Sequence, residues 1–195
     1  AEARSRLHAL IGCLPAGGWL GPRAGHLNPP LWEYGHLVWF QERWCVREGA
    51  DGTPAPSLLA GADALYDSST VPHDTRWDLP LLDPAAVDDY ARRVADAVAA
   101  RLRNAFDGDI AYFAELCLYH ELMHIEAWWM AFQDLGYAPP VWPQMGGVQS
   151  APRQVFTEGG VALGSGADEG FIFDNEKWRH TVAVPAFDID AIPVT

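Results

Sequence analysis

The chain has no hydrophobic run that approaches the roughly 18 residues needed for a membrane-spanning helix. Its N-terminus also lacks the basic and then apolar pattern of a secretion signal. We therefore predict a cytoplasmic protein that does not bind membranes.

Basic residues are scarce. The 195 residues include 13 Lys and Arg against 26 Asp and Glu, which gives a formal net charge of −13, and no basic cluster is visible. Nucleic acids and anionic membranes attract clustered positive charge, so we expect neither as a partner. A composition of 49% hydrophobic and 20% charged residues is typical of a globular protein with one sound core.

Cysteine is scarce too. Cys13, Cys45 and Cys117 are odd in number, widely spaced and embedded in apolar helical pattern. A disulfide framework in a small secreted domain has an even number of cysteines at short spacings. We expect reduced thiols in the core.

Apolar periodicity and capping residues predict four helices. Asn28 is the predicted N-cap of the second helix, ahead of two prolines, and Asp83 is that of the third, which Asp107 and Gly108 end. The stretch from Gly49 to Leu82 reads as a loop of about 34 residues, a length that is uncommon unless the loop is functional or poorly ordered. The four helices, three of them long, predict a mainly α fold with a four-helix bundle over 1–145; their ranges are 2–12, 29–48, 84–106 and 109–136.

The pattern changes after Gly136. Residues 137–154 are rich in Pro and Gly and read as a linker, with a domain boundary near 145–153. Residues 154–195 alternate like β-strands but are too few for an independent mixed domain. Either the sequence is truncated there or this segment packs on the bundle.

The longest predicted helix carries His120 and His124 four residues apart, which places both imidazoles on one helix face, where they can share a metal ion. A single histidine in an apolar stripe is usually an ordinary core residue. Two adjacent ones require a metal ion or hydrogen bonds, because an unpaired buried imidazole is costly. The rest of the stripe consists of Phe113, Cys117, Ala127 and Trp128.

One interpretation of the segment HELMH (120–124) is a zinc hydrolase, because it matches the H-E-x-x-H pattern in which the glutamate, here Glu121, is the general base. That class needs a third ligand downstream. The residues after His124 are IEAWWM, which offer neither the glycine nor the histidine of one version, and Glu158 is a weak candidate for the other.

A second interpretation places the site across the bundle. His36 lies in the stripe of the second helix and becomes the third ligand candidate, leaving coordination positions open as a catalytic iron, zinc or cobalt site requires. For Glu121 and Glu126 we expect ion pairs, with Arg43 and Arg47 as possible partners, or a role in orienting a ligand imidazole. The other members of the stripe are Trp32, Trp39, Phe40 and Arg43.

Three motifs in this order resemble the non-heme iron sulfoxide synthases of ergothioneine and ovothiol biosynthesis. HELMHIE begins 84 residues after His36, and the resemblance covers nearly the whole chain. The motifs are NPPLWEYGHLVWF (28–40), HELMHIE (120–126), and GGVALGS (159–165) with FIFDNEKWRHTVAVPAFDIDAIPVT (171–195).

The resemblance implies a DinB-like four-helix bundle over 1–145, followed by the N-terminal part of an α+β domain similar to the formylglycine-generating enzyme (C-type-lectin-like) over 154–195. It implies Fe(II) on His36, His120 and His124. The implied activity is O2-dependent carbon–chalcogen bond formation at the imidazole C2 of hercynine. The family's catalytic tyrosine and most hercynine contacts are expected beyond Thr195.

Departures from the family pattern concern the substrates. Members that use γ-glutamylcysteine carry an arginine-rich stretch where residues 62–83 hold one arginine and five aspartates. This segment resembles the selenoneine synthase branch, which takes a selenosugar, and Asp74, Arg76 and Asp78 are candidate donor contacts, although turn-forming and capping roles for them stay open. Met123 stands where some members have a glutamine near the imidazole.

Several alternatives stay open at this point. They include a sulfoxide synthase that uses γ-glutamylcysteine or cysteine, the zinc hydrolase, and a non-catalytic DinB-like metal-binding bundle. The segment FDNE (173–176) is expected to be structural, a turn whose Asp and Asn bind backbone amides, and His180 is not expected to be a ligand. The sequence does not indicate an oligomeric state.

Overall fold

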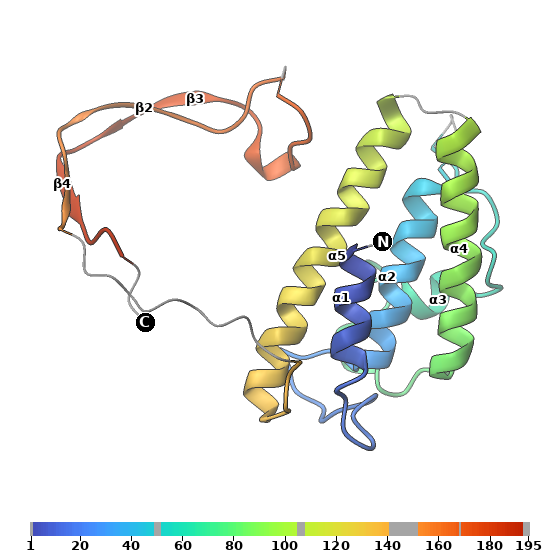
Figure 1. The fold of residues 1–195 in the computed structure, drawn as a ribbon. Coiled ribbons are helices and arrows are strands. Elements are labelled where there is room, and N and C mark those ends of the chain that lie inside the picture. Colours follow the sequence, from blue (N-terminus) through green and yellow to red (C-terminus); the bar gives the residue numbers. More distant parts are fainter. Residues whose placement is uncertain (1, 49–51, 105–107, 141–151, 168, 193–195) are drawn as a thin grey trace. The chain divides into compact units, whose positions relative to one another are not determined.

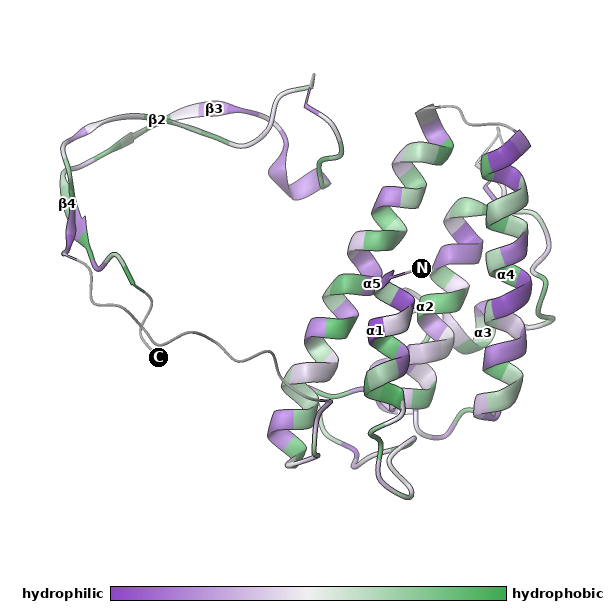
Figure 2. Ribbon diagram, in the orientation of Figure 1, coloured by the Kyte–Doolittle hydropathy of each residue, from purple (hydrophilic) through white to green (hydrophobic). Residues whose placement is uncertain are grey.

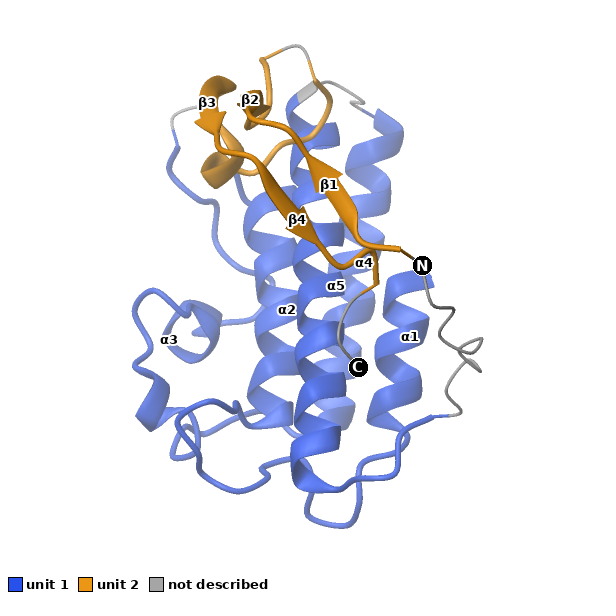
Figure 3. Cartoon of the chain, turned by 90° about the vertical axis from the view of Figure 1, so that its left-hand side faces the viewer, with its two compact units in different colours: residues 1–141 blue, residues 142–195 orange. Residues whose placement is uncertain are grey.

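The structure, a computed structural model, describes residues 2–48, 52–104, 108–140, 152–167 and 169–192. The chain divides into two compact units, residues 1–141 and 142–195, which are coloured separately in Figure 3. Within the described residues, no helix combines the length and the apolar character that crossing a bilayer requires.

The first unit is a bundle of helices (Figure 1). In it α2 packs against α3, α4 and α5, and α1 packs against α5. The four predicted helices are confirmed, with ends that differ by a few residues. The helices are α1 (Glu2–Ile11), α2 (Pro30–Cys45), α3 (Ala62–Tyr66), η1 (His73–Thr75), α4 (Pro84–Asn104) and α5 (Gly108–Leu135).

Helix α2 is the centre of the bundle, because every residue from Leu31 to Trp39 is buried. Three helices, α3, α4 and α5, cover it, so even its polar residues Glu33 and His36 are buried. The predicted cap at Asn28 is wrong: Pro29 precedes the helix without a side-chain cap, and the Asn28 Oδ1 instead accepts a hydrogen bond from Arg76. Proline fits there because the first turn leaves its amide positions unpaired anyway.

Helix α4 alternates hydrophobic and hydrophilic residues along its length, which Figure 2 shows. The predicted cap at Asp83 is confirmed, since its carboxylate accepts a hydrogen bond from the Ala86 amide at 2.8 Å. Its predicted end at residues 106–108 falls largely outside the described residues. The buried side chains follow a helical spacing and are Val87, Tyr90, Val94 and Val98.

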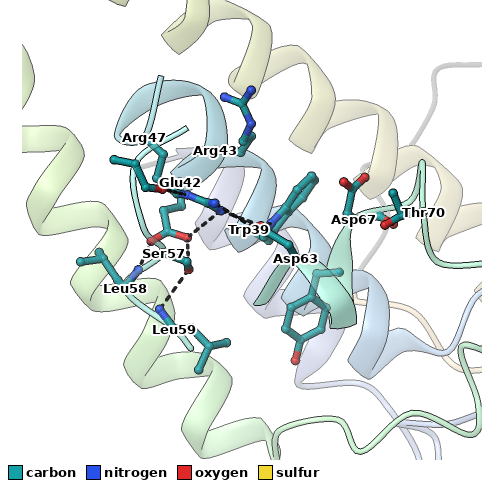
Figure 4. A network of polar contacts seen from close by, with 12 residues as sticks. Trp39, Glu42, Arg43, Arg47, Ser57, Leu58, Leu59, Asp63, Asp67 and Thr70 are labelled. Carbon is teal, nitrogen blue, oxygen red and sulfur yellow. Dashed lines mark hydrogen bonds and ion pairs between the residues drawn. The ribbon is translucent and has the colours of Figure 1, made fainter. Parts of the chain in front are cut away.

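The predicted loop 49–82 contains the short helix α3 and the 3-10 turn η1, so that prediction is wrong in this part. The contacts that hold α3 on α2 are long-range (Figure 4). Arg47 donates to both carboxylate oxygens of Asp63 at 2.7 and 2.9 Å, and the Trp39 indole donates to Asp63 at 2.6 Å. A five-residue helix is too short for periodicity to reveal.

A second polar anchor ties the start of the same segment to the bundle. Glu42 of α2 is fully buried and accepts hydrogen bonds from the Ser57 hydroxyl at 2.7 Å and from the Leu58 amide and the Tyr90 hydroxyl at 2.5 Å each. A buried carboxylate is stable only when such donors replace water. Residues 57–66 are therefore fixed to α2 at both ends, by Glu42 and by Asp63.

The second unit contains two antiparallel strand pairs, which confirms the predicted strands. β1 (Gln154–Phe156) pairs with β4 (Phe187–Ile189), and β2 (Gly159–Leu163) pairs with β3 (His180–Val184). The predicted linker falls mostly in residues 141–151, outside the described residues.

The FDNE segment is built around the 3-10 turn η2 (Asp174–Glu176). The Glu176 carboxylate accepts the Phe173 amide at 2.9 Å, and Asp174 accepts from Lys177 at 2.7 Å. The turn is therefore as expected, but a glutamate, rather than the aspartate, receives the described backbone amide.

Candidate metal centre

Three histidines from two helices converge in the first unit. His36 lies on α2, and His120 and His124 lie one turn apart on α5. One ring nitrogen from each lies within 4.8 Å of the others, and the Nε2 atoms of His36 and His120 are 3.3 Å apart. The packing of α2 against α5 thus brings together residues that are 84 positions apart in the sequence.

The ring of His36 is oriented by a backbone carbonyl. Its Nδ1 lies 2.8 Å from the carbonyl oxygen of Tyr66, at the end of α3, so Nδ1 carries the proton and donates it. Gly35 makes this possible, since a Cβ there would lie 2.2 Å from the Tyr66 ring. The Nε2 of His36 is consequently left with a free lone pair.

The ring of His124 is oriented by a carboxylate. Its Nδ1 lies 2.5 Å from Oε1 of Glu33, a buried residue on α2 one turn before His36. A carboxylate that accepts from one ring nitrogen leaves the other nitrogen free for a metal and makes it more basic. Both α2 and α5 therefore hold His124 in place.

Aromatic rings pack against the other two imidazoles. Trp32 stacks on His36 at 4.9 Å between ring centroids and an interplanar angle of 7°, and Phe40 stacks on His120 at 3.7 Å and 14°. These contacts restrict ring rotation and keep water from one side of each histidine. The Trp32 and Phe40 rings also make the surroundings of these two imidazoles largely apolar.

Burial keeps two of the imidazoles neutral. Loss of solvent lowers the pKa of His36 to about 4 and the pKa of His120 to about 2. Both rings therefore carry lone pairs at neutral pH. The two Nε2 atoms that face each other at 3.3 Å need a proton or a cation between them, and a divalent metal ion meets that need.

The donor set consists of three imidazoles, and in the described part of the chain it is the one His, Cys, Asp and Glu cluster with metal-ligand spacing. Three neutral nitrogens suit iron, zinc or cobalt better than magnesium or calcium, which prefer oxygen. A metal ion held by these three side chains would keep further coordination positions for ligands from outside the protein.

Glu121 is held by a different arginine from those expected. Both of its carboxylate oxygens accept from Arg4 of α1, at 2.7 and 3.2 Å, while Arg43 pairs with Glu48 and Arg47 with Asp63. The predicted partners of Glu121 are therefore wrong. A carboxylate engaged on both oxygens is poorly placed to act as the general base of a zinc hydrolase.

Four further side chains of α5 bear on the predicted site. Ala127, expected in the buried stripe, is exposed, while Cys117 and Trp128 are buried as predicted. Met123, between the two histidines of α5, is also exposed.

The structure brings one of the three donor-contact candidates close to the histidines. The Arg76 guanidinium lies 3.8 Å from the centroid of Trp32, and the Trp32 ring stacks on His36. Asp78 accepts from Arg23 at 2.5 Å, and the Asp74 carbonyl accepts from the same arginine at 3.3 Å. Arg23, from the segment before α2, thus places a second arginine beside the loop that contains Arg76.

Sequence reasoning missed the two groups that orient the ligands. Glu33 had a usable signal, because it lies three residues before His36 on the same helix and a carboxylate there faces the same neighbour helix. The Tyr66 carbonyl had none, since a backbone oxygen is not marked by any residue type. The Arg4 and Arg23 contacts likewise depend on tertiary packing.

Comparison with known proteins identifies the family of the helical unit. The sequence model of the DinB superfamily matches residues 1–128, more than half of the chain, so the chain belongs to the DinB superfamily. Three curated relatives are each named hercynine oxygenase. They come from Mycolicibacterium thermoresistibile (34% identical over 179 residues), Mycobacterium tuberculosis (33% over 179) and Mycolicibacterium smegmatis (30% over 176).

The matched region is 87% of this chain but only 39 to 41% of each relative. The chain thus spans about two fifths of the length of the curated relatives that it matches.

Proposed function

We propose that this chain is the metal-binding bundle, with the beginning of a formylglycine-generating-enzyme-like domain, of an Fe(II)-dependent oxidoreductase that acts on hercynine. The reaction is O2-dependent formation of a C–Se or C–S bond at the imidazole C2, with a selenosugar as donor. The convergence of His36, His120 and His124 in a chain whose relatives are named hercynine oxygenase carries this proposal.

In this proposal the three histidines hold the iron through the nitrogens that face one another. Bound iron supplies a site where the chalcogen donor and O2 meet beside the imidazole substrate. Glu33 and the Tyr66 carbonyl contact the Nδ1 atoms of His124 and His36 and so fix the tautomers of these two rings. The Nε2 atoms of the two rings are therefore oriented towards the site before the metal binds. Trp32 and Phe40 exclude water from one side of the site.

The choice of donor rests on the charges of the segment 62–83. Both terminal nitrogens of Arg76 are engaged, one by Asn28 at 2.7 Å and the other by the Val71 carbonyl at 3.4 Å. A guanidinium in this state is a poor bidentate clamp for the carboxylates of γ-glutamylcysteine. The exposed carboxylate of Asp74 instead offers an acceptor to sugar hydroxyls and repels an acidic donor, whereas Asp78 is already paired with Arg23 at 2.5 Å.

Oxygen uptake tests the proposal. The full-length protein, loaded anaerobically with Fe(II), should consume O2 only when both hercynine and a donor are present, and the product should contain both. Metal-dependent peptide hydrolysis without O2 uptake would indicate the zinc hydrolase instead. Metal binding with neither activity would indicate a non-catalytic bundle.

The donor is tested separately by competition. Binding of a 1-seleno- or 1-thio-sugar should be tighter than binding of γ-glutamylcysteine or cysteine to the iron-loaded protein with hercynine. Tighter binding of the dipeptide refutes the selenosugar argument while leaving the oxidoreductase proposal standing.

A further inference from the structure

Two buried cysteines lie in contact between the helices that hold the histidines. Cys45 is at the end of α2 and Cys117 is on α5, one turn before His120. Their sulfur atoms are 3.6 Å apart, and the side chains are 0% and 6% exposed. Three cysteines were expected to be separate core thiols, but the packing places two of them side by side.

We propose that Cys45 and Cys117 are a reversible redox modification site, in which a peroxide converts the two thiols into a disulfide that cross-links α2 and α5. The inference does not depend on the proposed function. In proteins of reducing compartments, disulfides are usually transient and respond to the redox state.

The chemistry needs one peroxide molecule for each pair. The Cys45 sulfur attacks a peroxide oxygen, which breaks the O–O bond, gives a sulfenic acid and releases the first water. The Cys117 sulfur then attacks the sulfenic sulfur, the S–S bond forms, and the hydroxyl leaves as the second water. Two thiols are oxidised by two electrons and one peroxide is reduced to two waters.

The surroundings favour Cys45 as the first sulfur to react. The contact with Cys117 lowers the pKa of Cys45, and the charge of Arg101, which donates to the Cys45 carbonyl at 3.2 Å, acts in the same direction. Cys117 keeps its proton, because the same contact and burial raise its pKa. A sulfur of lowered pKa next to a thiol that keeps its proton is the arrangement that the two-step reaction uses.

The pair also has a protective consequence. A lone oxidised cysteine continues to sulfinic acid, which is irreversible in most proteins, whereas a sulfenic acid next to a second thiol stops at the disulfide. Cys117 lies 3.9 Å from the Phe40 carbonyl, and the ring of Phe40 stacks on His120. Stopping at the disulfide therefore preserves the contact of Cys117 with Phe40, the residue that stacks on the candidate ligand His120.

The test uses metal-free protein with Cys13→Ser, which removes the half-buried third thiol and with it any intermolecular disulfide. After a day in excess hydrogen peroxide, catalase removes the oxidant and the denatured protein is alkylated. We expect no alkylation of either thiol, isolation of Cys45 and Cys117 in one disulfide-linked peptide pair, and full recovery of both thiols with dithiothreitol.

Single substitutions separate this pair from two independent thiols. With Cys117→Ser added, Cys45 should gain about 32 Da as sulfinic acid, and dithiothreitol should not reverse the change. In thermal melts the cross-linked form should have a Tm roughly 10 °C above the reduced form, because the bond closes a long loop. The proposal is overturned if both thiols remain alkylatable, or if Cys45 becomes sulfinic acid while Cys117 is still present.

Discussion

The Glu33 carboxylate lies 2.5 Å from the Nδ1 of His124, and the two residues belong to different helices. Helix α2 therefore provides one candidate ligand, His36, and also the group that orients a second ligand on α5. The geometry of the candidate metal centre therefore depends on the packing of α2 against α5, and we expect changes to this helix pair to change the affinity for a metal ion.

Removing the charge of Glu33 should weaken metal binding. Glu33→Gln keeps the size of the side chain but loses the carboxylate charge that holds a proton on the Nδ1 of His124 and so directs its other ring nitrogen to the metal. Changes at such a carboxylate typically reduce metal affinity 10- to 100-fold, and we expect a loss of about 10-fold for Co(II), measured by optical titration.

Glu126→Gln is the matched control, because Glu126 is an exposed residue two positions after His124. Its Co(II) affinity should equal that of the unmodified protein. If Glu33→Gln binds Co(II) as tightly as this control, Glu33 does not orient the site.

A methyl group at Gly35 should disturb the centre through the backbone. The added Cβ of Gly35→Ala would lie 2.2 Å from the Tyr66 ring, so α3 must move and the Tyr66 carbonyl must leave the Nδ1 of His36. We expect loss of roughly 1–3 kcal/mol in the free energy of unfolding, as overpacking usually causes, together with weaker Co(II) binding. Urea unfolding and optical titration measure the two effects.

Gly25→Ala controls for the change of residue type, since no atom lies within 4 Å of a Cβ at that position. Its stability and Co(II) affinity should match those of the parent protein. Equal behaviour of the two variants would show that α3 yields without disturbing His36.

Features that depend on neighbouring residues could be predicted from the sequence, whereas features that depend on contacts between distant residues could not. The four helices α1, α2, α4 and α5 could be predicted because each carries its own apolar periodicity, and the i, i+4 spacing of His120 and His124 is a local property as well. Helix α3 could not, because the Arg47 and Asp63 ion pair that holds it on α2 joins residues 16 positions apart.

The same division applies to the candidate site. Ligand residues are recognisable by type, so all three histidines of the cluster could be identified in advance. Their orientation depends on Glu33, on a carbonyl oxygen at Tyr66 and on the space at Gly35, which only the packed structure reveals. Glu121 shows the converse, since its motif indicated a catalytic base and the fold pairs it with Arg4.

Loss of His36 should be as damaging to metal binding as loss of His124, if both are ligands. We expect His36→Ala and His124→Ala to retain no stoichiometric Fe(II) after gel filtration, measured by elemental analysis. His26→Ala is the control, because His26 is exposed and pairs with Asp134 on the surface. Full iron content in His36→Ala would show that the three-histidine site is wrong.

The stability of the metal-free protein should fall as the pH is lowered from about 6.5 towards 4. Burial holds the pKa of His36 at about 4 and that of His120 at about 2, against 6.5 in the unfolded chain. The unfolded state therefore takes up these two protons first. Their contribution is complete above pH 6.5 and is lost as the pH falls towards the folded values, with a slope of up to about 2.7 kcal/mol per pH unit.

Urea unfolding of metal-free protein at pH 7.5, 6 and 5, followed by tryptophan fluorescence, measures this slope. His36→Gln removes one titrating group, so its slope between pH 6 and 5 should be roughly half that of the parent protein, whatever its absolute stability. Because only the pH dependence is compared, a variant that is less stable at every pH still gives an answer. Parallel curves for the two proteins would mean that His36 is not held neutral by burial between α2 and α5.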